Sequence, residues 1–248
     1  MRMRVEFAGI SAVLFDIEGT TTPLEFVHKT LFSYAGERVE DFLKENSSEK
    51  QVAHLLDMLE KSHKDNSSSG KSPHAWPTAD FSQKIDSAAK YVRWLISVDS
   101  KDPALKELQG LIWEEGYRKN QLHGEVYPDV PEAMEKLNVD GIKMAIYSSG
   151  SALAQRLIFR STKYGDLTKY LTGFFDTSVG PKRDPKSYAN IAGLLGLPNG
   201  EILFLSDILE EIAAARASGL MAVQVLREGH NTAKDTSFLT ISSLLDLF

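Results

Sequence analysis

The run Ile10–Ile17, with the sequence ISAVLFDI, decides the fold of this chain together with Glu18–Thr21 (EGTT), which follows it directly. Its residues are mostly apolar or β-branched and show no polar alternation, a pattern typical of a strand that is buried on both faces. Such strands belong to parallel sheets covered by helices. The run therefore predicts a central strand that ends at Asp16, with a sharp turn at Gly19.

After about Tyr127, strand-like and helix-like segments alternate along the chain. Helices are predicted from Ser151, from Asp184–Pro185 to about Gly196, and over Ile208–Ser218. The strands predicted in this part are Ile142–Tyr147, which precedes the first of these helices, Phe174–Phe175, Ile202–Leu205 and Met221–Leu226. Met221–Leu226 is predicted to be the last strand of the chain. Alternation of this kind implies right-handed connections and helices on both faces of a sheet. With the opening strand added, the predicted class is α/β, with a Rossmann-like parallel sheet.

Residues 25–124 carry no comparable strand pattern and show apolar residues at helical spacing instead. The clearest stripe follows a predicted N-cap, Asp80, and consists of Phe81, Ile85, Ala88, Val92 and Leu95. Residues 62–80 are rich in Ser, Asn, Gly and Pro, which predicts a surface loop. We therefore predict a core made of residues 1–24 and 125–248, interrupted by a helical insertion over residues 25–124.

The composition excludes several classes of protein. Among 248 residues, 28 Lys and Arg face 34 Asp and Glu, a net charge of −6, so we expect no nucleic-acid partner. No apolar run is long enough to span a bilayer, and Met1–Glu6 is not followed by the apolar segment of a leader, so no membrane partner is expected. The absence of cysteine excludes disulfides and thiolate metal sites and suits a reducing compartment. We expect a cytoplasmic monomer.

Four polar residues lie at the ends of predicted strands or in the loop that follows one. They are Asp16, Ser148, Lys182 and Asp207. Because ligands of open parallel sheets bind outside the carboxyl ends of the strands, we expect these side chains to converge. Carboxylates hold Mg²⁺, while hydroxyl and ammonium groups hold phosphate oxygens. The set predicts a site for a divalent cation and a phosphate group.

Asp16 and Glu18 place two acids close together at the end of the first strand. The Asp16 carboxylate can attack phosphorus and form an aspartyl phosphate, which divides one difficult displacement into two easier ones. Glu18 can protonate the leaving oxygen and then activate water. Taken singly, each predicted site residue also has a plain structural interpretation, as a helix cap, a turn residue or a solvated lysine. Arg183 and Lys186 are alternatives to Lys182 as the cation of the loop.

These motifs resemble those of the haloacid dehalogenase superfamily, whose first motif reads Asp-x-Asp-Gly-Thr or a close variant after an apolar strand. The resemblance implies that Asp16 is the nucleophile and that the helical insertion is a cap domain. The chain departs from the pattern at Glu18, where the superfamily has Asp. The acid is thereby moved outward by one methylene, while metal ligation through the main-chain carbonyl of residue 18 is left intact.

The same resemblance implies the remaining roles. Ser148 and Ser149 (in IYSSG) and Lys182 (in VGPKRDP) stand where the superfamily binds substrate phosphate. Asp207, in ILFLSDILEE, stands at the fourth motif, so that Asp16, Glu18 and Asp207 are implied as the ligands of Mg²⁺. Glu211 stands where many members carry another acid, which implies a supporting role through water.

A closer resemblance rests on three stretches, which are DIEGTTTP (Asp16–Pro23), IYSSGSALAQRLIF (Ile146–Phe159) and GFFDT (Gly173–Thr177). They are similar to the enolase-phosphatase family, the acireductone synthases of methionine salvage. This implies a small phosphorylated diketone, 2,3-diketo-5-methylthiopentyl 1-phosphate, that is enolised and then dephosphorylated with Mg²⁺ as cofactor. Enolisation needs a base and an electrophile for the enolate oxygen. Asp16 or Glu18 can be the base, and Mg²⁺ or Lys182 the electrophile, and the sequence does not rank them.

Other functions use a similar set of residues. A different phosphatase acting on another small phosphomonoester, or a phosphomutase, needs the same core, and a dehalogenase uses the aspartate without a metal. A receiver-type signalling domain also combines acids, a hydroxyl, a lysine and Mg²⁺. Receivers are about half as long, however, and have no use for an acid at the position of Glu18. A purely binding role is disfavoured because every catalytic position is occupied.

Overall fold

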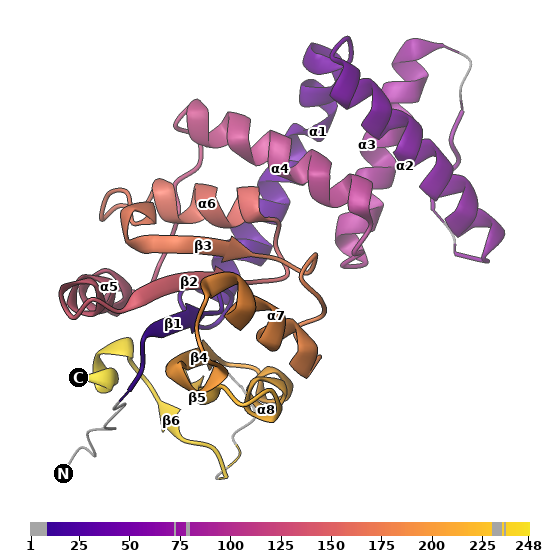
Figure 1. Ribbon diagram of the computed structural model, residues 1–248. Coiled ribbons are helices and arrows are strands. Elements are labelled where there is room, and N and C mark those ends of the chain that lie inside the picture. The colour runs from indigo at the N-terminus through magenta and orange to yellow at the C-terminus, as the bar shows by residue number, and fades with distance from the viewer. Residues whose placement is uncertain (1–8, 72, 78–79, 230–234, 236) are drawn as a thin grey trace. The chain divides into compact units, whose positions relative to one another are not determined.

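The computed structural model describes residues 9–71, 73–77, 80–229, 235 and 237–248, so that Met1–Glu6 lies outside the described part. By its contacts the chain forms two compact units. One, the α/β unit, consists of Met1–Phe26 and His123–Phe248, and the other, the helical unit, of Val27–Leu122. Figure 1 shows the strands gathered in the first and long helices in the second.

The α/β unit is built on one six-stranded sheet in which neighbouring strands run parallel, in the order β3-β2-β1-β4-β5-β6 (Figure 1). The strands are β1 (Ala12–Phe15), β2 (Lys143–Tyr147), β3 (Leu171–Phe175), β4 (Ile202–Ser206), β5 (Met221–Val225) and β6 (Thr240–Ile241). β1 lies between β2 and β4, with Leu14 opposite Ala145 and Phe204. The predicted α/β class and the central position of the opening strand are confirmed.

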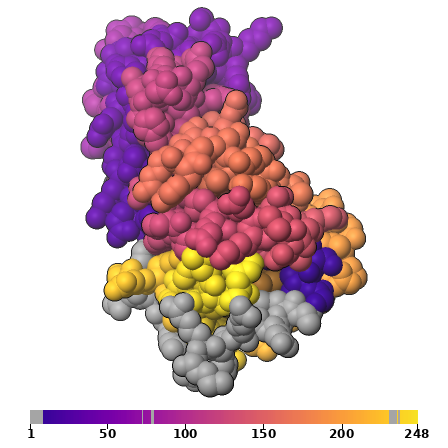
Figure 2. Space-filling view, turned by 90° about the vertical axis from the view of Figure 1, so that its left-hand side faces the viewer, coloured from indigo at the N-terminus to yellow at the C-terminus, as the bar shows by residue number. Residues whose placement is uncertain are grey.

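Helices cover both faces of this sheet. They are α5 (Asp129–Val139), α6 (Ala152–Arg160), α7 (Pro185–Leu195) and α8 (Leu209–Ala217). On one face, Tyr188 and Ile191 of α7 and Ile212 of α8 pack with Leu14 and Phe204 in a buried cluster. α5 and α6 contact β2 and β3 on the other face. The C-terminal 3-10 helix η4 (Leu244–Leu247) packs beside α5, and Figure 2 shows these C-terminal residues, in yellow, on that side of the unit.

Two features of the α/β unit differ from the sequence prediction. The prediction that Met221–Leu226 holds the last strand is wrong, because β6 follows it and pairs in parallel with β5. A strand of two residues is too short to show any alternation of apolar and polar residues. α5 has no counterpart among the predicted helices, although its residues Val130, Ala133, Met134 and Leu137 are buried at helical spacing.

The helical unit buries most of the apolar stripe predicted after Asp80, although Phe81 at its start is 59% exposed. Its α-helices are α1 (Phe32–Asn46), α2 (Lys50–Ser68), α3 (Phe81–Ser97) and α4 (Pro103–Arg118), preceded by the π-helical segment η1 (Phe26–Leu31). Asp80 caps α3 as predicted, since its side chain accepts a hydrogen bond from the main-chain N–H of Gln83 at 2.8 Å. Trp113 of α4 donates from Nε1 to the carbonyl of Leu31 at 2.8 Å and is 7% exposed.

The predicted loop over residues 62–80 is wrong in its first part, because α2 continues to Ser68. The hydroxyls of Ser67 and Ser68 donate to main-chain carbonyls one turn earlier, at 2.9 Å each, and so do not interrupt the helix. His63, which is 7% exposed, packs against the rings of Tyr91 and Trp76. Tertiary packing therefore outweighs the polar composition that predicted a loop.

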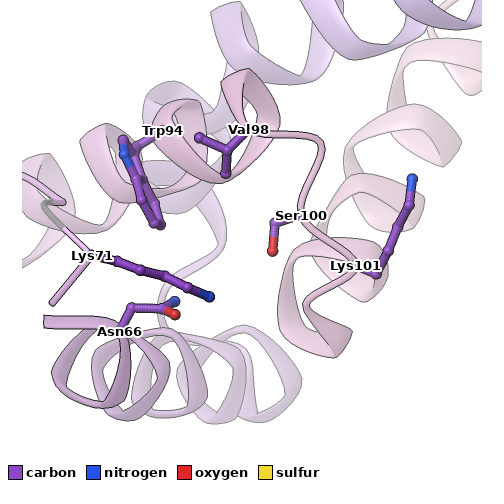
Figure 3. A pocket seen from close by; sticks show the side chains of 6 residues that line it. All are labelled: Asn66, Lys71, Trp94, Val98, Ser100 and Lys101. Atoms are coloured by element: carbon purple, nitrogen blue, oxygen red, sulfur yellow. The ribbon is translucent and has the colours of Figure 1, made fainter. Parts of the chain in front are cut away.

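The helical unit also has a hollow of about 520 Å³, shown in Figure 3. Its lining residues are Asn66, Lys71, Trp94, Val98, Ser100 and Lys101. Figure 3 shows Lys71 extending between Trp94 and Asn66. None of the described lining residues belongs to the predicted site. Among the helices that the structure describes, none is both long enough and apolar enough to cross a membrane.

Candidate active site

Three of the predicted site residues stand at the carboxyl ends of adjacent strands. Asp16 follows β1, Ser148 follows β2 and Asp207 follows β4. Because these strands are neighbours and parallel, the three residues emerge at one edge of the sheet. Each is buried, with between 3% and 4% of its surface exposed.

Lys182 comes from the loop between β3 and α7 and joins two acids. Its Nζ lies 2.5 Å from Oδ1 of Asp16 and 2.6 Å from Oε2 of Glu211, and its side chain is 10% exposed. Burial by itself would lower the pKa of Lys182, but the two carboxylates outweigh burial and hold that pKa above its usual range. The ammonium therefore keeps its charge. Arg183 and Lys186, the two alternatives of the sequence analysis, are both exposed, with Lys186 on the first turn of α7.

Glu211 of α8 supports this lysine directly. Its Oε2 accepts a hydrogen bond from the hydroxyl of Ser206 at 2.8 Å, in addition to its ion pair with Lys182. Burial and the nearby charge of Asp16 raise the pKa of Glu211 to about 7, although Lys182 works in the opposite direction. Where the resemblance implied a contact through water, the structure has a direct ion pair.

Thr20 links the two acids that end β1 and β4. Its hydroxyl donates to Oδ2 of Asp16 at 3.3 Å and accepts from the main-chain N–H of Asp207 at 3.0 Å. Gly19 precedes it with φ of +73°, and a Cβ at that position would lie 2.5 Å from Oδ2 of Asp207. The loop can therefore approach Asp207 this closely only because residue 19 has no side chain.

Asp207 has the properties expected of a cation ligand. Its Oδ1 is buried and has no hydrogen-bond partner within the described part of the chain. Burial, followed by the charges of Asp16 and Glu211, raises the pKa of Asp207 to about 7. A buried carboxylate oxygen without a donor, close to a second carboxylate, is costly unless a cation compensates it. The residues present therefore fit a magnesium ion, whose preferred ligands are oxygens.

The loop that carries Lys182 is fixed by buried aromatic residues. The hydroxyl of Tyr188 donates to the carbonyl of Lys182 at 2.6 Å, and that of Tyr147 donates to the carbonyl of Gly180 at 2.9 Å. The hydroxyl of Ser187 donates to the carbonyl of Pro181 at 2.8 Å. These bonds fix the main chain of the loop and thereby the position from which the Lys182 side chain extends to Asp16.

Some of the predicted residues are in contact with one another. Asp16 is in contact with Lys182 and is linked to Asp207 through Thr20. Ser148 uses its hydroxyl to accept from the main-chain N–H of Gly150 at 3.2 Å. The remaining two predicted residues stand in the loops after β1 and β2, with Ser149 exposed and Glu18 partly exposed.

Sequence reasoning did not assign a role to Thr20, Gln224 or Arg227. Gln224 of β5 is fully buried and donates from Nε2 to the carbonyl of Asp207 at 3.0 Å, and a glutamine inside the apolar strand MAVQV is a signal that the sequence does contain. Arg227 donates twice to the carbonyl of Thr20. Nothing in the sequence near Arg227 indicates this contact.

Known proteins resemble the chain over most of its length. Residues 10–219 match the family described as haloacid dehalogenase-like hydrolase. The enolase-phosphatase E1 of Pseudomonas fluorescens (strain Pf0-1) is 41% identical over 220 residues, which are 89% of this chain and 90% of that protein. The enolase-phosphatase E1 of Synechococcus elongatus is 40% identical, over 96% of this chain and 98% of that protein.

A solved structure is also similar to the chain over most of its length. The UTR4 protein of Saccharomyces cerevisiae superimposes with a TM-score of 0.75 and 30% sequence identity, over 94% of this chain and 98% of that one. The match of the hydrolase family covers β1, β2 and β4, whose ends carry Asp16, Ser148 and Asp207. The chain belongs to the enolase-phosphatase E1 family of haloacid dehalogenase-like hydrolases.

Proposed function

We propose that the chain is a magnesium-dependent phosphoric monoester hydrolase that acts as an enolase-phosphatase. It enolises 2,3-diketo-5-methylthiopentyl 1-phosphate and then removes the phosphate to give the acireductone. The observation that carries this proposal is the Asp16 carboxylate at the end of β1, 2.5 Å from Lys182 Nζ and joined through Thr20 to Asp207. The names of the relatives support the choice of reaction.

In the phosphatase step, the carboxylate of Asp16 forms a bond to phosphorus while the bond from phosphorus to the substrate oxygen breaks. Glu18 gives its proton to the leaving oxygen. A water molecule then attacks phosphorus, Glu18 takes a proton from that water, and the Asp16 carboxylate is released. Lys182 stays charged and stabilises the negative charge that gathers on the phosphoryl oxygens, with Ser148 and Ser149 as further donors to phosphate.

Asp16 and Asp207 would hold the magnesium ion, together with the main-chain carbonyl of Glu18. The orphaned Oδ1 of Asp207 supports this assignment. When bound, the ion supplies positive charge beside the phosphoryl group. A bound cation would offset the repulsion between the two carboxylates, which raises the pKa of Asp207 in its absence.

In the enolase step, a carboxylate removes a proton from the carbon next to a carbonyl group. We propose that Asp16 and Glu18 share the work across the two steps, because they are the acids nearest the end of β1. Lys182 is a donor for the developing enolate oxygen, since its ammonium is held charged by Asp16 and Glu211.

We further propose that the helical unit, predicted from sequence as residues 25–124, serves as the cap that selects the substrate. It has its own buried core and carries none of the predicted catalytic residues, which suits a part that varies with substrate. We propose a cytoplasmic location, which the absence of cysteine supports, and a monomeric state.

Phosphate release and the absorbance of the enediol, measured from the diketo phosphate with and without Mg²⁺, test the proposal. We expect both signals with Mg²⁺ and neither after chelation. Hydrolysis of para-nitrophenyl phosphate without any reaction of the diketo phosphate would keep a phosphatase of this family and reject the proposed substrate. Activity that survives chelation would reject the magnesium-dependent mechanism.

A further inference from the structure

Arg227 lies just beyond β5 and donates two hydrogen bonds to one main-chain carbonyl. Its Nε and Nη2 lie 2.9 Å and 2.6 Å from the carbonyl oxygen of Thr20, and the residue is only 7% exposed. The planar fork of a guanidinium can hold one acceptor with two donors, whereas a lysine ammonium is a single point of charge. The carbonyl of Thr20 is therefore fixed in position from the far end of the chain.

The side chain of Thr20 lies between Asp16 and Asp207, the two acids of the site. Its hydroxyl contacts Oδ2 of Asp16 and the main-chain N–H of Asp207. A shift of the Thr20 main chain therefore moves a hydrogen-bond partner of each acid at once. Because the loop also passes Asp207 at Gly19 with no room for a Cβ, such a shift alters the approach of the loop to Asp207.

Arg227 is itself in contact with an acid and an aromatic ring. Its Nη1 lies 2.7 Å from Oδ2 of Asp129, at the start of α5, and its guanidinium lies 4.2 Å from the centre of the Tyr127 ring. The same Asp129 oxygen accepts from the hydroxyl of Ser243 at 2.9 Å and the main-chain N–H of Leu244 at 2.6 Å. The C-terminal segment beside α5 (Figure 2) thus contacts the same carboxylate oxygen as the arginine.

From these contacts we infer that Arg227 is a positioning residue, which sets the spacing of Asp16 and Asp207 through Thr20. The inference rests on the proposed phosphatase function for its consequence in catalysis, but the positioning itself is a property of the fold. A plain structural role is the alternative, in which Arg227 and Asp129 form a buried ion pair that only stabilises the unit.

The variants Arg227→Met and Arg227→Lys, compared with Asp129→Asn, separate the two roles. Asp129→Asn removes the acid of the ion pair but keeps both bonds from Arg227 to Thr20. If Arg227 is a positioning residue, Arg227→Met lowers kcat on para-nitrophenyl phosphate about ten- to a hundredfold with little change in KM. Arg227→Lys recovers part of kcat, and Asp129→Asn keeps kcat within about twofold of the parent while lowering the melting temperature.

Two readouts do not depend on turnover. Calorimetric titration with Mg²⁺ alone should give a weaker dissociation constant for Arg227→Met and an unchanged one for Asp129→Asn. Deuterium exchange of peptides over residues 202–209, which include the Asp207 amide, should rise in Arg227→Met only. Equal effects of Arg227→Met and Asp129→Asn on kcat, Mg²⁺ binding and exchange would overturn the inference.

Arg227→Lys serves the same comparison if Arg227→Met does not fold, because it keeps the positive charge beside Asp129. Unchanged kcat, Mg²⁺ binding and exchange in Arg227→Lys would then overturn the inference. If the parent protein hydrolyses neither the diketo phosphate nor para-nitrophenyl phosphate, the proposed function fails. Mg²⁺ binding and exchange still decide the role of Arg227 in that case.

Discussion

The ammonium nitrogen of Lys182 lies 2.5 Å from Oδ1 of Asp16, and the two side chains are 10% and 5% exposed. A buried ion pair of this kind is costly to break, because removal of one partner leaves the other charged and desolvated. The carboxylate is the form of Asp16 that attacks phosphorus, and the ammonium lies directly beside it. The ion pair therefore contributes to the reaction as well as to the stability of the fold.

Replacement of Lys182 by Met should lower kcat for phosphate release by about a hundredfold or more, since the positive charge facing the phosphoryl oxygens is lost. Steady-state phosphate release with the diketo phosphate measures this effect. Lys186→Met is the matched control, because Lys186 is exposed on the first turn of α7, so that this variant should keep the parent kcat. A Lys182→Met enzyme with kcat near that of the parent would refute the assigned role.

Asp16→Asn should abolish phosphate release and also slow formation of the enediol, if Asp16 and Glu18 share both steps. The amide cannot attack phosphorus and is a far weaker base than the carboxylate. Phosphate release and enediol absorbance, followed in the same sample, give both rates. Loss of phosphate release with an unchanged enolisation rate would exclude Asp16 as the enolising base and leave Glu18.

Without metal, the free energy of unfolding should fall as the pH rises from about 5 to 8. Asp207 and Glu211 have pKa values raised to about 7, so the folded state binds more protons than the unfolded state in this interval. The stability that these protonated acids contribute is present at low pH and is lost as the pH passes 7, by at most about 1.4 kcal/mol per pH unit for each group.

Urea unfolding in a chelator at pH 5, 6, 7 and 8 measures this slope. Excess Mg²⁺ should flatten or reverse it, because the ion binds the ionised carboxylates of the folded state only. Asp207→Asn should reduce the slope in the absence of metal and remove most of the response to Mg²⁺. A metal-free stability that is flat over this interval would contradict the raised pKa values.

Gly19→Ala should weaken Mg²⁺ binding, because the added Cβ would lie 2.5 Å from Oδ2 of Asp207. Its positive φ adds a cost of about 1 kcal/mol or more to folding. Gly196→Ala at the end of α7 is the matched control, since its φ of +66° imposes similar strain but no atom lies within 4 Å of the added Cβ. Of the two variants, only Gly19→Ala should change the calorimetric affinity for Mg²⁺, and an equal change in Gly196→Ala would refute the role of Gly19.

Much of the fold was predictable because local pattern and tertiary structure agree there. The unbroken apolar run before Asp16 is a central strand, and the stripe after Asp80 is a capped helix. The sequence did not reveal β6, which is only two residues long, or the full extent of α2. In α2, packing of His63 against Tyr91 overrides a composition that favours a loop.

The candidate site likewise contains residues that the sequence pattern can locate and contacts that it cannot. Asp16 and Asp207 stand at strand ends, a position that sequence periodicity can locate. The contact between Arg227 and Thr20 joins residues that are 207 positions apart, and the bond from Tyr188 to the carbonyl of Lys182 depends on how α7 is docked. Contacts of this kind follow from the assembled sheet and its helices, and no local spacing encodes them.

The formation of a phosphoryl bond to Asp16 is the central claim, and mass spectrometry of acid-quenched enzyme tests it most directly. Glu18→Gln, mixed with para-nitrophenyl phosphate and Mg²⁺, should accumulate one phosphoryl group on the peptide that contains Asp16, because nitrophenolate leaves without a proton from Glu18. The double variant with Asp16→Asn should accumulate none. A phosphoryl group on any other residue, or phosphate release by Asp16→Asn at the parent rate, would contradict the account.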